Sequence, residues 1–248
     1  MSSCSSNNRN NLVGQAALVT GATSGIGRAI ALRLARDGAE VVVHGRDAER
    51  GKNVVDAISA EGGRARFVAA DVGDAAAVTR LAEEAGDVDI LVNNAGFSWF
   101  GPTADLDAES FDAMFASNVR SAYLLVAALA PKMAVRGKGS IVNLSSMAAQ
   151  VGLPGGAAYS ATKASLAAMT RSWAAEFSPG VRVNAIAPGP VFTAGSAPDR
   201  SAQLGETTIL KRAAQPEEIA DAVAFLVSPE AAYFTGATIA ADGGRTAS

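Results

Sequence analysis

Short apolar runs alternate along the chain with longer Ala- and Leu-rich segments whose apolar positions recur every three or four residues. Runs such as Val41-Val42-Val43 are rich in β-branched residues and almost free of polar interruptions, which is typical of strands buried on both faces. Strands of this kind, in alternation with helices, build a parallel sheet that helices cover on both sides. The pattern therefore predicts a single α/β domain with a doubly wound parallel sheet.

The individual elements follow from the same two periodicities. Seven strands are expected, at residues 16–20, 40–44, 65–70, 89–93, 140–145, 181–187 and 238–241. Long helices are expected at about residues 28–37, 109–135 and 157–177. The segment from residue 188 to about 210 is rich in Pro, Gly, Ser and Thr, and a loop is expected there. Because a loop of this length in a compact domain usually has a function, we interpret it as a lid over a ligand rather than a plain surface excursion.

A length of 248 residues without a low-complexity spacer fits one domain. We assign residues 12–248 to it and expect the Ser- and Asn-rich residues 1–11 to form a disordered tail. This tail has no apolar stretch of the kind found in signal peptides, and no later apolar run approaches the roughly 18 residues that span a bilayer. We therefore expect no membrane segment.

The composition narrows the class of partner. Acidic and basic residues are interspersed at a formal net charge of -3, which argues against nucleic acid and against attraction to a membrane surface. Cys4 is the single cysteine, which fits a reducing compartment, so we expect a cytoplasmic protein. His44 is the single histidine, so neither a Ser-His-Asp triad nor a His-rich metal site can form, and an ordinary strand-end role is expected for it. We predict a small-molecule partner and no metal.

The first predicted strand runs directly into a glycine-rich turn, TGATSGIG at residues 20–27. Its glycines allow a sharp turn and close approach of the backbone to a phosphate, and the helix that follows points its N–H groups and positive end at the same place. Tight strand-to-helix turns need glycine without any ligand, so the turn alone is a weak signal. Its place after the first strand and before an amphipathic helix favours a dinucleotide site and a sheet of the Rossmann type.

Tyr159 and Lys163 lie four residues apart on a predicted helix, so their side chains share one face. Ser145 and Ser146 end a predicted strand upstream. A tyrosine with a pKa near its usual 10 is a poor acid or base at neutral pH, and a nearby ammonium group lowers the pKa of a phenol. The arrangement fits acid–base catalysis in which Lys163 tunes Tyr159. The alternative is that YSATK only begins an Ala-rich helix, because Tyr and Lys four residues apart often occur by chance.

Together these motifs resemble the short-chain dehydrogenase/reductase family over about residues 12–244. The resemblance rests on the GxxxGxG spacing of the glycine turn, on NNAG at 93–96 and on YSATK at 159–163. It implies an NAD(P)(H)-dependent oxidoreductase that moves a hydride between nicotinamide C4 and a carbonyl or secondary alcohol.

The resemblance also implies a catalytic tetrad, formed by Asn118, Ser146, Tyr159 and Lys163. In the family, the serine binds the substrate oxygen and the tyrosine passes it a proton. The lysine holds the nicotinamide ribose hydroxyls, and the asparagine anchors a water that leads from the lysine to solvent. The family's serine-to-tyrosine spacing selects Ser146, which leaves Ser145 as a strand-end residue.

Cofactor contacts are implied along much of the chain. They are Gly21, Thr23, Ser24, Gly25, Ile26, Gly27, Arg46, Asp71, Val72, Asn94, Ala95, Gly96, Tyr159, Lys163, Pro188, Gly189, Val191 and Thr193. Some have a plainer alternative. Asp71 could cap the helix that begins near Asp74, and Asn93 and Asn94 could only tie strand-end backbone groups together.

The choice of nicotinamide depends on the sequence His44-Gly45-Arg46-Asp47 at the end of the second strand. An acidic side chain there would bind the ribose 2′-OH and repel a 2′-phosphate, whereas an arginine would attract the phosphate. Asp47 lies at about the right distance from the glycine turn to favour NAD. If the strand ends at His44, however, the acidic position falls on Gly45, Arg46 reads the phosphate and Asp47 caps the next helix. NADP(H) is therefore favoured over NAD(H).

The substrate is less defined. LKRAAQPEEIADAVAFLVS at 210–228 and the Asp242-Gly243-Gly244 ending resemble the 3-oxoacyl-carrier-protein reductases, but the same features recur in sugar, steroid and xenobiotic dehydrogenases. A basic cluster could meet an acidic acyl carrier protein or could be a solvated helix end; it consists of Lys132, Arg136 and Lys138. Three aromatic residues after the NNAG turn could be core or pocket wall, namely Phe97, Trp99 and Phe100.

Two long helices, at about 109–135 and 157–177, have small and apolar faces too large for packing on a sheet alone. The family uses such helices in a dimer interface, so a homotetramer is expected. Two rival functions stay open: an NADP(H)-binding sensor or scaffold without turnover, and a dehydratase or epimerase on the same fold.

Overall fold

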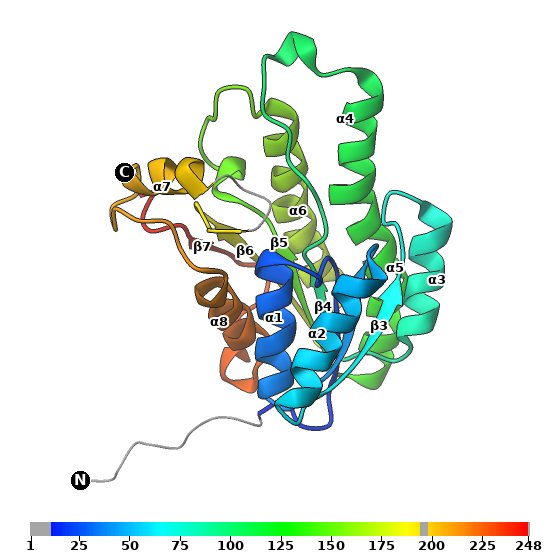
Figure 1. The fold of residues 1–248 in the computed structure, drawn as a ribbon. Coiled ribbons are helices and arrows are strands. Elements are labelled where there is room, and N and C mark those ends of the chain that lie inside the picture. Colours follow the sequence, from blue (N-terminus) through cyan, green and yellow to red (C-terminus); the bar gives the residue numbers. More distant parts are fainter. Residues whose placement is uncertain (1–10, 194–197, 248) are drawn as a thin grey trace, which may run out of the picture.

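The computed structural model describes residues 11–193 and 198–247, and it shows a seven-stranded parallel sheet between two layers of helices (Figure 1). The strands are β1 (Ala16–Val19), β2 (Glu40–Gly45), β3 (Arg64–Ala69), β4 (Ile90–Asn93), β5 (Gly139–Leu144), β6 (Val181–Pro188) and β7 (Thr238–Ala241). The α-helices are α1 (Gly25–Arg36), α2 (Ala48–Ala60), α3 (Ala75–Ala85), α4 (Ala108–Phe115), α5 (Ser121–Arg136), α6 (Ala157–Glu176), α7 (Pro198–Glu206) and α8 (Pro216–Val227). The predicted fold class is confirmed.

The order of the strands fixes where a ligand can bind. The sheet runs β3-β2-β1-β4-β5-β6-β7, so β1 lies between β2 and β4. The chain adds β2 and β3 on one side of β1, and it then adds β4 to β7 in the opposite direction on the other side. Leu18 in β1 is in register with Val42 on one side and Leu91 on the other. In open parallel sheets, a crevice forms beyond the carboxyl ends of the strands at such a reversal. The fold therefore places a ligand site beyond the ends of β1 and β4.

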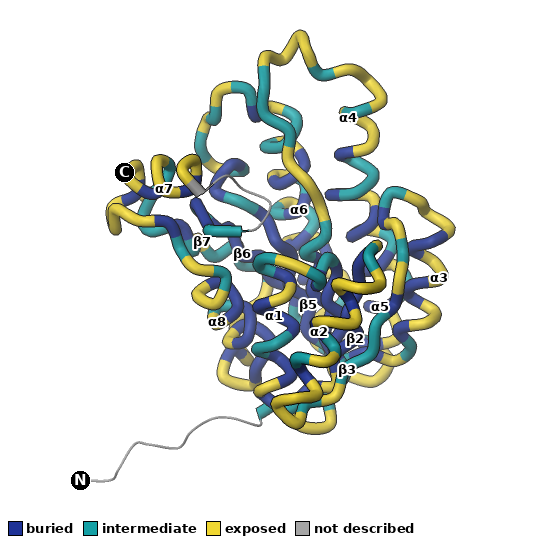
Figure 2. Tube along the Cα trace, viewed as in Figure 1, coloured by how far each residue is buried: buried dark blue, intermediate teal, exposed yellow. Residues whose placement is uncertain are grey.

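Alternate residues of each strand feed two separate cores. In β1, Ala17 and Val19 pack on the side of α1, α2 and α8, whereas Leu18 packs on the side of α3, α5 and α6. Between these layers the inner strands are buried along most of their length, whereas the edge strands β3 and β7 are only partly buried (Figure 2). Burial on both faces explains why the strands read as almost continuous apolar runs in the sequence.

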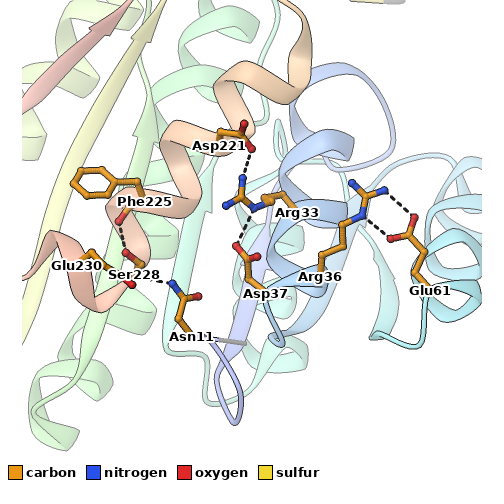
Figure 3. A network of polar contacts seen from close by, with 9 residues as sticks. All are labelled: Asn11, Arg33, Arg36, Asp37, Glu61, Asp221, Phe225, Ser228 and Glu230. Atoms are coloured by element: carbon orange, nitrogen blue, oxygen red, sulfur yellow. Dashed lines mark hydrogen bonds and ion pairs between the residues drawn. The ribbon is translucent and has the colours of Figure 1, made fainter. Parts of the chain in front are cut away.

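Ion pairs tie α1 to its neighbours at the end of the sheet opposite the crevice (Figure 3). Arg33 contacts both Asp37 and Asp221, which links α1 to α8, and Arg36 pairs with Glu61 after α2. The carboxylates of Asp221 and Glu61 are largely exposed, so solvent screens these contacts. The network fixes the packing of α1 without taking part in the site at the other end of that helix.

Two predicted elements differ from the structure. The expected helix over residues 109–135 is interrupted by a π-helical segment, Ala116–Arg120, between α4 and α5. The expected loop over residues 188–210 contains the nine-residue helix α7, whose Ser201 is buried and donates to the carbonyl of Val191. Residues 194–197 of this segment lie outside the described part of the chain, and its role as a lid stays a prediction.

One helical stretch, Ala108–Arg136, is long and apolar enough to cross a membrane by length and composition alone. Its most apolar 18-residue window has a mean hydropathy of 1.4. Half of its most apolar window is buried in the protein, where Leu125, Leu129 and Met133 of α5 belong to the core beside α3. Its apolar character is thus explained by packing in this fold.

The amino terminus is described only from residue 11 onward. Asn11 lies in a turn before β1, and its side-chain amide donates to Glu230 at 3.2 Å. Residues 1–10, including Cys4, lie outside the described part of the chain. The assignment of residues 1–11 to a tail and of residues 12–248 to one catalytic domain therefore stays a prediction.

Candidate active site

The glycine turn connects β1 to α1 at the edge of the crevice. Gly21 and Gly25 have φ values of 64° and 51°, in the left-handed region that favours glycine. Ser24 precedes the helix in extended conformation, and its side chain makes no capping hydrogen bond. The amides of the first turn of α1 are thus not capped by Ser24, which suits a helix end that receives an anion.

A set of short hydrogen bonds joins the NNAG turn to the glycine turn. The hydroxyl of Thr20 accepts from the backbone N–H groups of Asn94 and Ala95, at 2.9 and 3.0 Å. The side-chain amide of Asn94 donates to the carbonyls of Thr20 and Gly21, at 2.8 and 3.2 Å. Asn94 therefore ties strand-end backbone groups together, which was the structural interpretation of this residue. It also lines the crevice, where a cofactor could contact it.

The crevice is an elongated cleft of about 580 Å³ beyond the ends of β1, β2 and β4. Thirteen of the predicted cofactor residues line it, namely Gly21, Thr23, Ser24, Gly25, Ile26, Gly27, Arg46, Asp71, Val72, Asn94, Ala95, Gly96 and Thr193. Asp71 does not cap α3; that helix is capped by Asp74, whereas the Asp71 carboxylate accepts from the backbone N–H of Gly73. Asp47 caps α2, as predicted, by accepting from the N–H of Arg50.

A second cavity of about 300 Å³ adjoins the cleft and shares Ile26, Asn94, Gly96, Phe97 and Thr193 with it. The other predicted residues lie here, namely Ser146, Tyr159, Lys163, Pro188, Gly189 and Val191. They come from the ends of β5 and β6 and from the first turns of α6. All the predicted cofactor residues thus line one of the two connected cavities.

Tyr159 and Ser146 both line the second cavity, and an interaction with the Ser146 side chain acts to lower the pKa of Tyr159. The Ser146 hydroxyl also accepts from the backbone N–H of Ala148, at 3.1 Å, which fixes its position. Ser145 is turned away, because its buried hydroxyl donates to the carbonyl of Lys163 at 2.9 Å. Of the two serines, Ser146 is therefore the one beside the phenol.

Lys163 is 6% exposed, and its ammonium group donates to the carbonyl of Leu144 at 2.7 Å. The Nζ atom lies 5.7 Å from the centre of the Tyr159 ring. Burial lowers the pKa of Lys163 to about 8, because a dry environment disfavours the charged form. Lys163 thus sits close enough to Tyr159 to act on it through charge.

The expected lowering of the pKa of Tyr159 was wrong for the protein without a bound ligand. Desolvation by the surrounding protein raises the pKa of Tyr159, and the interaction with the Ser146 side chain offsets only part of this increase. The sequence shows the neighbouring lysine but not the enclosure of the phenol. Tyr159 is therefore held in its protonated form, which is the form that donates a proton.

Asn118 lies in the π-helical segment, is 1% exposed and lines neither cavity. Its side-chain oxygen accepts from the N–H of Phe97 at 2.9 Å, and its amide donates to the carbonyl of Phe97 at 2.8 Å and to Thr162 at 3.1 Å. Single-turn π-segments often occur at functional sites. Here the segment turns Asn118 so that it fixes the loop after NNAG against the residue next to Lys163.

Aromatic residues form the outer wall of the site. Phe97 is 47% exposed and lines both cavities. The Phe100 ring lies 5.5 Å from the Tyr159 ring, and the guanidinium group of Arg200, in α7, lies 4.7 Å from the centre of the Phe100 ring. Phe97 thus belongs to the pocket wall, whereas Phe100 packs on Tyr159 and carries the positive charge of Arg200 on its ring.

His44 lies at the end of β2, as expected, and its side chain makes two backbone contacts that the sequence did not show. Its ring is buried at the end of β2, where Nδ1 accepts from the N–H of Gly21 at 3.1 Å and Nε2 lies 3.1 Å from the carbonyl of Ala70. Thr20 and Thr162 were also missed, although both fix residues of the site. A polar ring at the end of a buried strand was the available signal for His44.

A dinucleotide fits these cavities. The cleft offers left-handed glycines and a helix N-terminus for a pyrophosphate, and the second cavity, with its buried lysine and protonated phenol, continues from it. Within residues 11–193 and 198–247, no group of three or more His, Cys, Asp or Glu side chains is arranged to hold a metal ion. The donor set suits an organic cofactor.

Comparison with known proteins agrees with this geometry. The model of a family described as Enoyl-(Acyl carrier protein) reductase matches residues 21–246. Dehydrogenase/reductase SDR family member 4 of Bos taurus is 40% identical over 255 residues, which cover 98% of this chain and 91% of the relative. The chain belongs to the short-chain dehydrogenase/reductase family. As a member, it is an oxidoreductase that uses a nicotinamide cofactor and acts on CH–OH or C=O groups.

Two solved structures of short-chain dehydrogenase/reductases are similar over almost the whole chain. One, provisionally named a betaketoacyl-ACP reductase, is 48% identical with a TM-score of 0.89, covering 96% of this chain and 100% of the other. The other, from Beutenbergia cavernae, is provisionally named an NAD(P)-dependent gluconate 5-dehydrogenase and has bound NADP at low occupancy. It is 38% identical with a TM-score of 0.92, covering 97% of this chain and 100% of the other.

Proposed function

We propose that this short-chain dehydrogenase/reductase is an NADP(H)-dependent carbonyl reductase and secondary-alcohol dehydrogenase. The observation that carries the proposal is the meeting of Tyr159, Ser146 and Lys163 in one cavity that opens onto the nucleotide cleft. A protonated phenol and a serine hydroxyl that line the same cavity form a site for one carbonyl oxygen. These groups have the types and the mutual geometry needed for proton transfer.

In the proposed reduction, Ser146 donates a hydrogen bond to the substrate oxygen and orients the carbonyl. Tyr159 donates its phenolic proton to that oxygen as negative charge develops there. When bound, the nicotinamide supplies the hydride in reduction and accepts it in oxidation. In the oxidative direction, Tyr159 takes the proton back from the alcohol.

Lys163 has two proposed roles. Its charge, 5.7 Å from the Tyr159 ring, stabilises the phenolate that remains after proton donation. Its other role is to hold the cofactor ribose hydroxyls. Asn118 is proposed to support the proton path from Lys163, and its side-chain amide is held in place by Phe97 and Thr162.

The preference for NADP(H) is supported by the end of β2. A Cβ at Gly45 would lie 2.4 Å from Cγ2 of Thr23, so an acidic side chain that reads the ribose 2′-OH does not fit there unless Thr23 moves. Arg46 is exposed and lines the cleft, whereas Asp47 is engaged as the cap of α2. The local charge facing a 2′-phosphate is therefore positive.

Replacing Arg46 by alanine is expected to lower kcat/KM with NADPH by about 10- to 100-fold, the equivalent of one charge-assisted hydrogen bond. The value with NADH should change little, because NADH lacks the 2′-phosphate. Steady-state kinetics with both cofactors measures the ratio of kcat/KM with NADPH to kcat/KM with NADH. Lys52→Ala, at an exposed lysine of α2 that pairs with Asp56, is the matched control and should leave both values unchanged. Equal losses with the two cofactors would contradict the role of Arg46.

For the substrate, we propose a 3-oxoacyl thioester. The family model and one solved relative carry acyl-carrier-protein substrates in their names. Phe97 lines the cavity and provides an apolar surface for an acyl chain, Phe100 packs on Tyr159 beside it, and Arg200 provides a positive charge for an acidic carrier. The alternative, a sugar, steroid or other secondary-alcohol dehydrogenase, is supported by the gluconate 5-dehydrogenase name of the NADP-bound relative.

The predicted basic cluster is a poor docking site for an acyl carrier. The cluster lies around the end of α5 and the start of β5, at the end of the strands opposite the catalytic cavity. It consists of Lys132, Arg136 and Lys138. Arg136 contacts Asp87, and Lys138 lies 3.9 Å from Asp89. A carrier bound there would hold its acyl group at the wrong end of the sheet.

Reduction of a panel of oxoacyl, sugar, steroid and aryl ketones, assayed with NADPH and NADH separately, tests the proposal. We expect turnover with NADPH to exceed turnover with NADH and to be highest with an oxoacyl thioester. Higher activity with NADH throughout would overturn the cofactor assignment. Absence of cofactor oxidation with every ketone would favour the rival in which the protein is a sensor or scaffold, and conversion without net redox change would favour a dehydratase or epimerase.

The proposed assembly is a homotetramer in the cytoplasm. Large side chains are exposed on the α4–α5 side, namely Phe111, Tyr123 and Val135, and near the carboxyl terminus, namely Phe225, Tyr233 and Phe234. Exposed apolar side chains on two different parts of the surface suit two different interfaces between copies. Light scattering under native conditions should give about four times the chain mass of 25.0 kDa. A mass of one chain would contradict the assembly.

A further inference from the structure

The imidazole of His44 connects three separate segments of the nucleotide cleft. It is 2% exposed at the end of β2, between the glycine turn after β1 and the end of β3. Nδ1 lies 3.1 Å from the backbone N of Gly21, and Nε2 lies 3.1 Å from the carbonyl oxygen of Ala70. The carbonyl of His44 also accepts from the N–H of Ala22 at 2.8 Å. Both the side chain and the backbone of this residue therefore hold the glycine turn.

The two ring contacts fix the protonation state of His44. The N–H of Gly21 can only donate, so Nδ1 must carry a lone pair, and the carbonyl of Ala70 can only accept, so Nε2 must carry the proton. The ring is thus neutral in the Nε2–H form. A second proton would place an N–H on Nδ1 directly against the N–H of Gly21 and would break that contact.

The contact falls on a residue with little freedom to move. Gly21 has a φ of 64°, and its carbonyl accepts from the side-chain amide of Asn94. A Cβ at Gly21 would already lie 3.0 Å from Cα of Ala95. The turn is therefore pinned between the NNAG turn on one side and His44 on the other, and a change at His44 must shift it.

We propose that His44 is a positioning residue for the nicotinamide cofactor: its neutral imidazole holds the glycine turn in the shape that receives the pyrophosphate, and a protonated imidazole releases that turn. The inference rests on the proposed cofactor site. It concerns binding and not the chemical step, because His44 lies in the nucleotide cleft and is absent from the lining of the cavity with Tyr159.

The surroundings set the pH range. Burial is the largest influence and lowers the pKa of His44 below its ordinary 6.5, although the contact with Ala70 and the negative charge of Asp71 act in the opposite direction. Arg46, two residues along, adds a positive charge on the same cleft. The unfolded chain thus takes up this proton at a higher pH than the folded chain, so the stability that His44 provides is complete above about pH 6.5 and is lost as the pH falls through the lower, folded value.

Two variants separate the contact from the charge. His44→Asn keeps an acceptor for the N–H of Gly21 but cannot titrate, whereas His44→Leu loses the acceptor and leaves that N–H unpaired. We expect His44→Leu to raise the KM for NADPH about tenfold with kcat at saturating cofactor nearly unchanged. We expect His44→Asn to stay within about threefold of the wild type at pH 8 and to show a smaller rise of KM than the wild type as the pH falls toward about 5.

The comparison between wild type and His44→Asn is the decisive one, because titration of the cofactor phosphate affects both equally. Parallel pH profiles of KM, or an unchanged KM in His44→Leu, would overturn the inference. If His44→Leu does not fold, the His44→Asn profile still decides. Because the chain has one histidine, NMR of protein with ¹⁵N-labelled histidine reads its tautomer directly, and an Nδ1–H ring would also overturn it. This readout needs no turnover, so it stays informative even if the proposed ketone reduction fails.

Discussion

Replacing Tyr159 by phenylalanine is expected to lower kcat for ketone reduction by about 10²- to 10⁴-fold, the range that a positioned general acid contributes. The variant keeps the ring that contacts Phe100 and loses only the hydroxyl that shares the cavity with Ser146. Cofactor affinity should change much less, because the glycine turn and Arg46 are untouched. Steady-state kcat and a binding titration with NADPH measure the two effects.

The chain offers a matched control for this variant. Tyr233 is fully exposed near the carboxyl terminus, and Tyr233→Phe removes one phenolic hydroxyl far from the cavity. Its kcat should equal that of the wild type. Full activity in Tyr159→Phe, with or without a change in the control, would contradict the assignment of Tyr159 as the proton donor.

A methyl group at position 27 is expected to abolish most cofactor binding. The Cβ of Gly27→Ala would lie 2.2 Å from the carbonyl oxygen of Gly21 and 2.4 Å from Nδ2 of Asn94, both parts of the wall where the glycine and NNAG turns meet. Relief requires the helix to move away from the strand, and overpacking of this kind costs about 1–3 kcal/mol. We expect a lower Tm and at least about a tenfold loss of NADPH affinity.

Gly152→Ala is the control for this substitution, since a Cβ there meets nothing within 4 Å and its φ lies outside the left-handed region. Its Tm and NADPH affinity should match those of the wild type. Wild-type affinity in Gly27→Ala would show that α1 can shift without cost and would remove the glycine turn from the cofactor site.

The inner strands could be predicted because they are buried on both faces and therefore carry their own signal. The run Val41-Val42-Val43 reads as a strand without any knowledge of its neighbours, and the ends of β2 were placed within one residue. The glycine turn was equally readable, since Gly21 and Gly25 adopt the left-handed conformation for which glycine is the natural residue.

The features that were missed depend on contacts between distant residues. His44 meets Gly21 and Ala70, which lie 23 and 26 residues away, and only the order of β1, β2 and β3 brings them together. The π-segment around Asn118 leaves the apolar pattern of the helix continuous, so no local signal marks it. In both cases the tertiary fold, and not the local sequence, decides the geometry.

The pKa of Tyr159 illustrates the same limit in electrostatics. Spacing along a helix showed that Lys163 is near, which lowers the pKa of a phenol, but enclosure by the surrounding protein raises it and prevails in the structure. Burial also lowers the pKa of Lys163 to about 8, and the motif gave no sign of that burial. Residue types therefore indicated the chemistry correctly, whereas their protonation states required the three-dimensional surroundings.

The most direct test of hydride transfer follows the atom that moves. The wild-type enzyme is given NADPH that carries deuterium at nicotinamide C4, on each face in turn, together with the best ketone of the panel, and the alcohol is examined by mass spectrometry and NMR. We predict deuterium at the carbinol carbon from one of the two labelled cofactors, with the hydroxyl proton drawn from the medium through Tyr159. An alcohol without deuterium from either cofactor, or no alcohol at all, would contradict the assignment of this site as a carbonyl reductase.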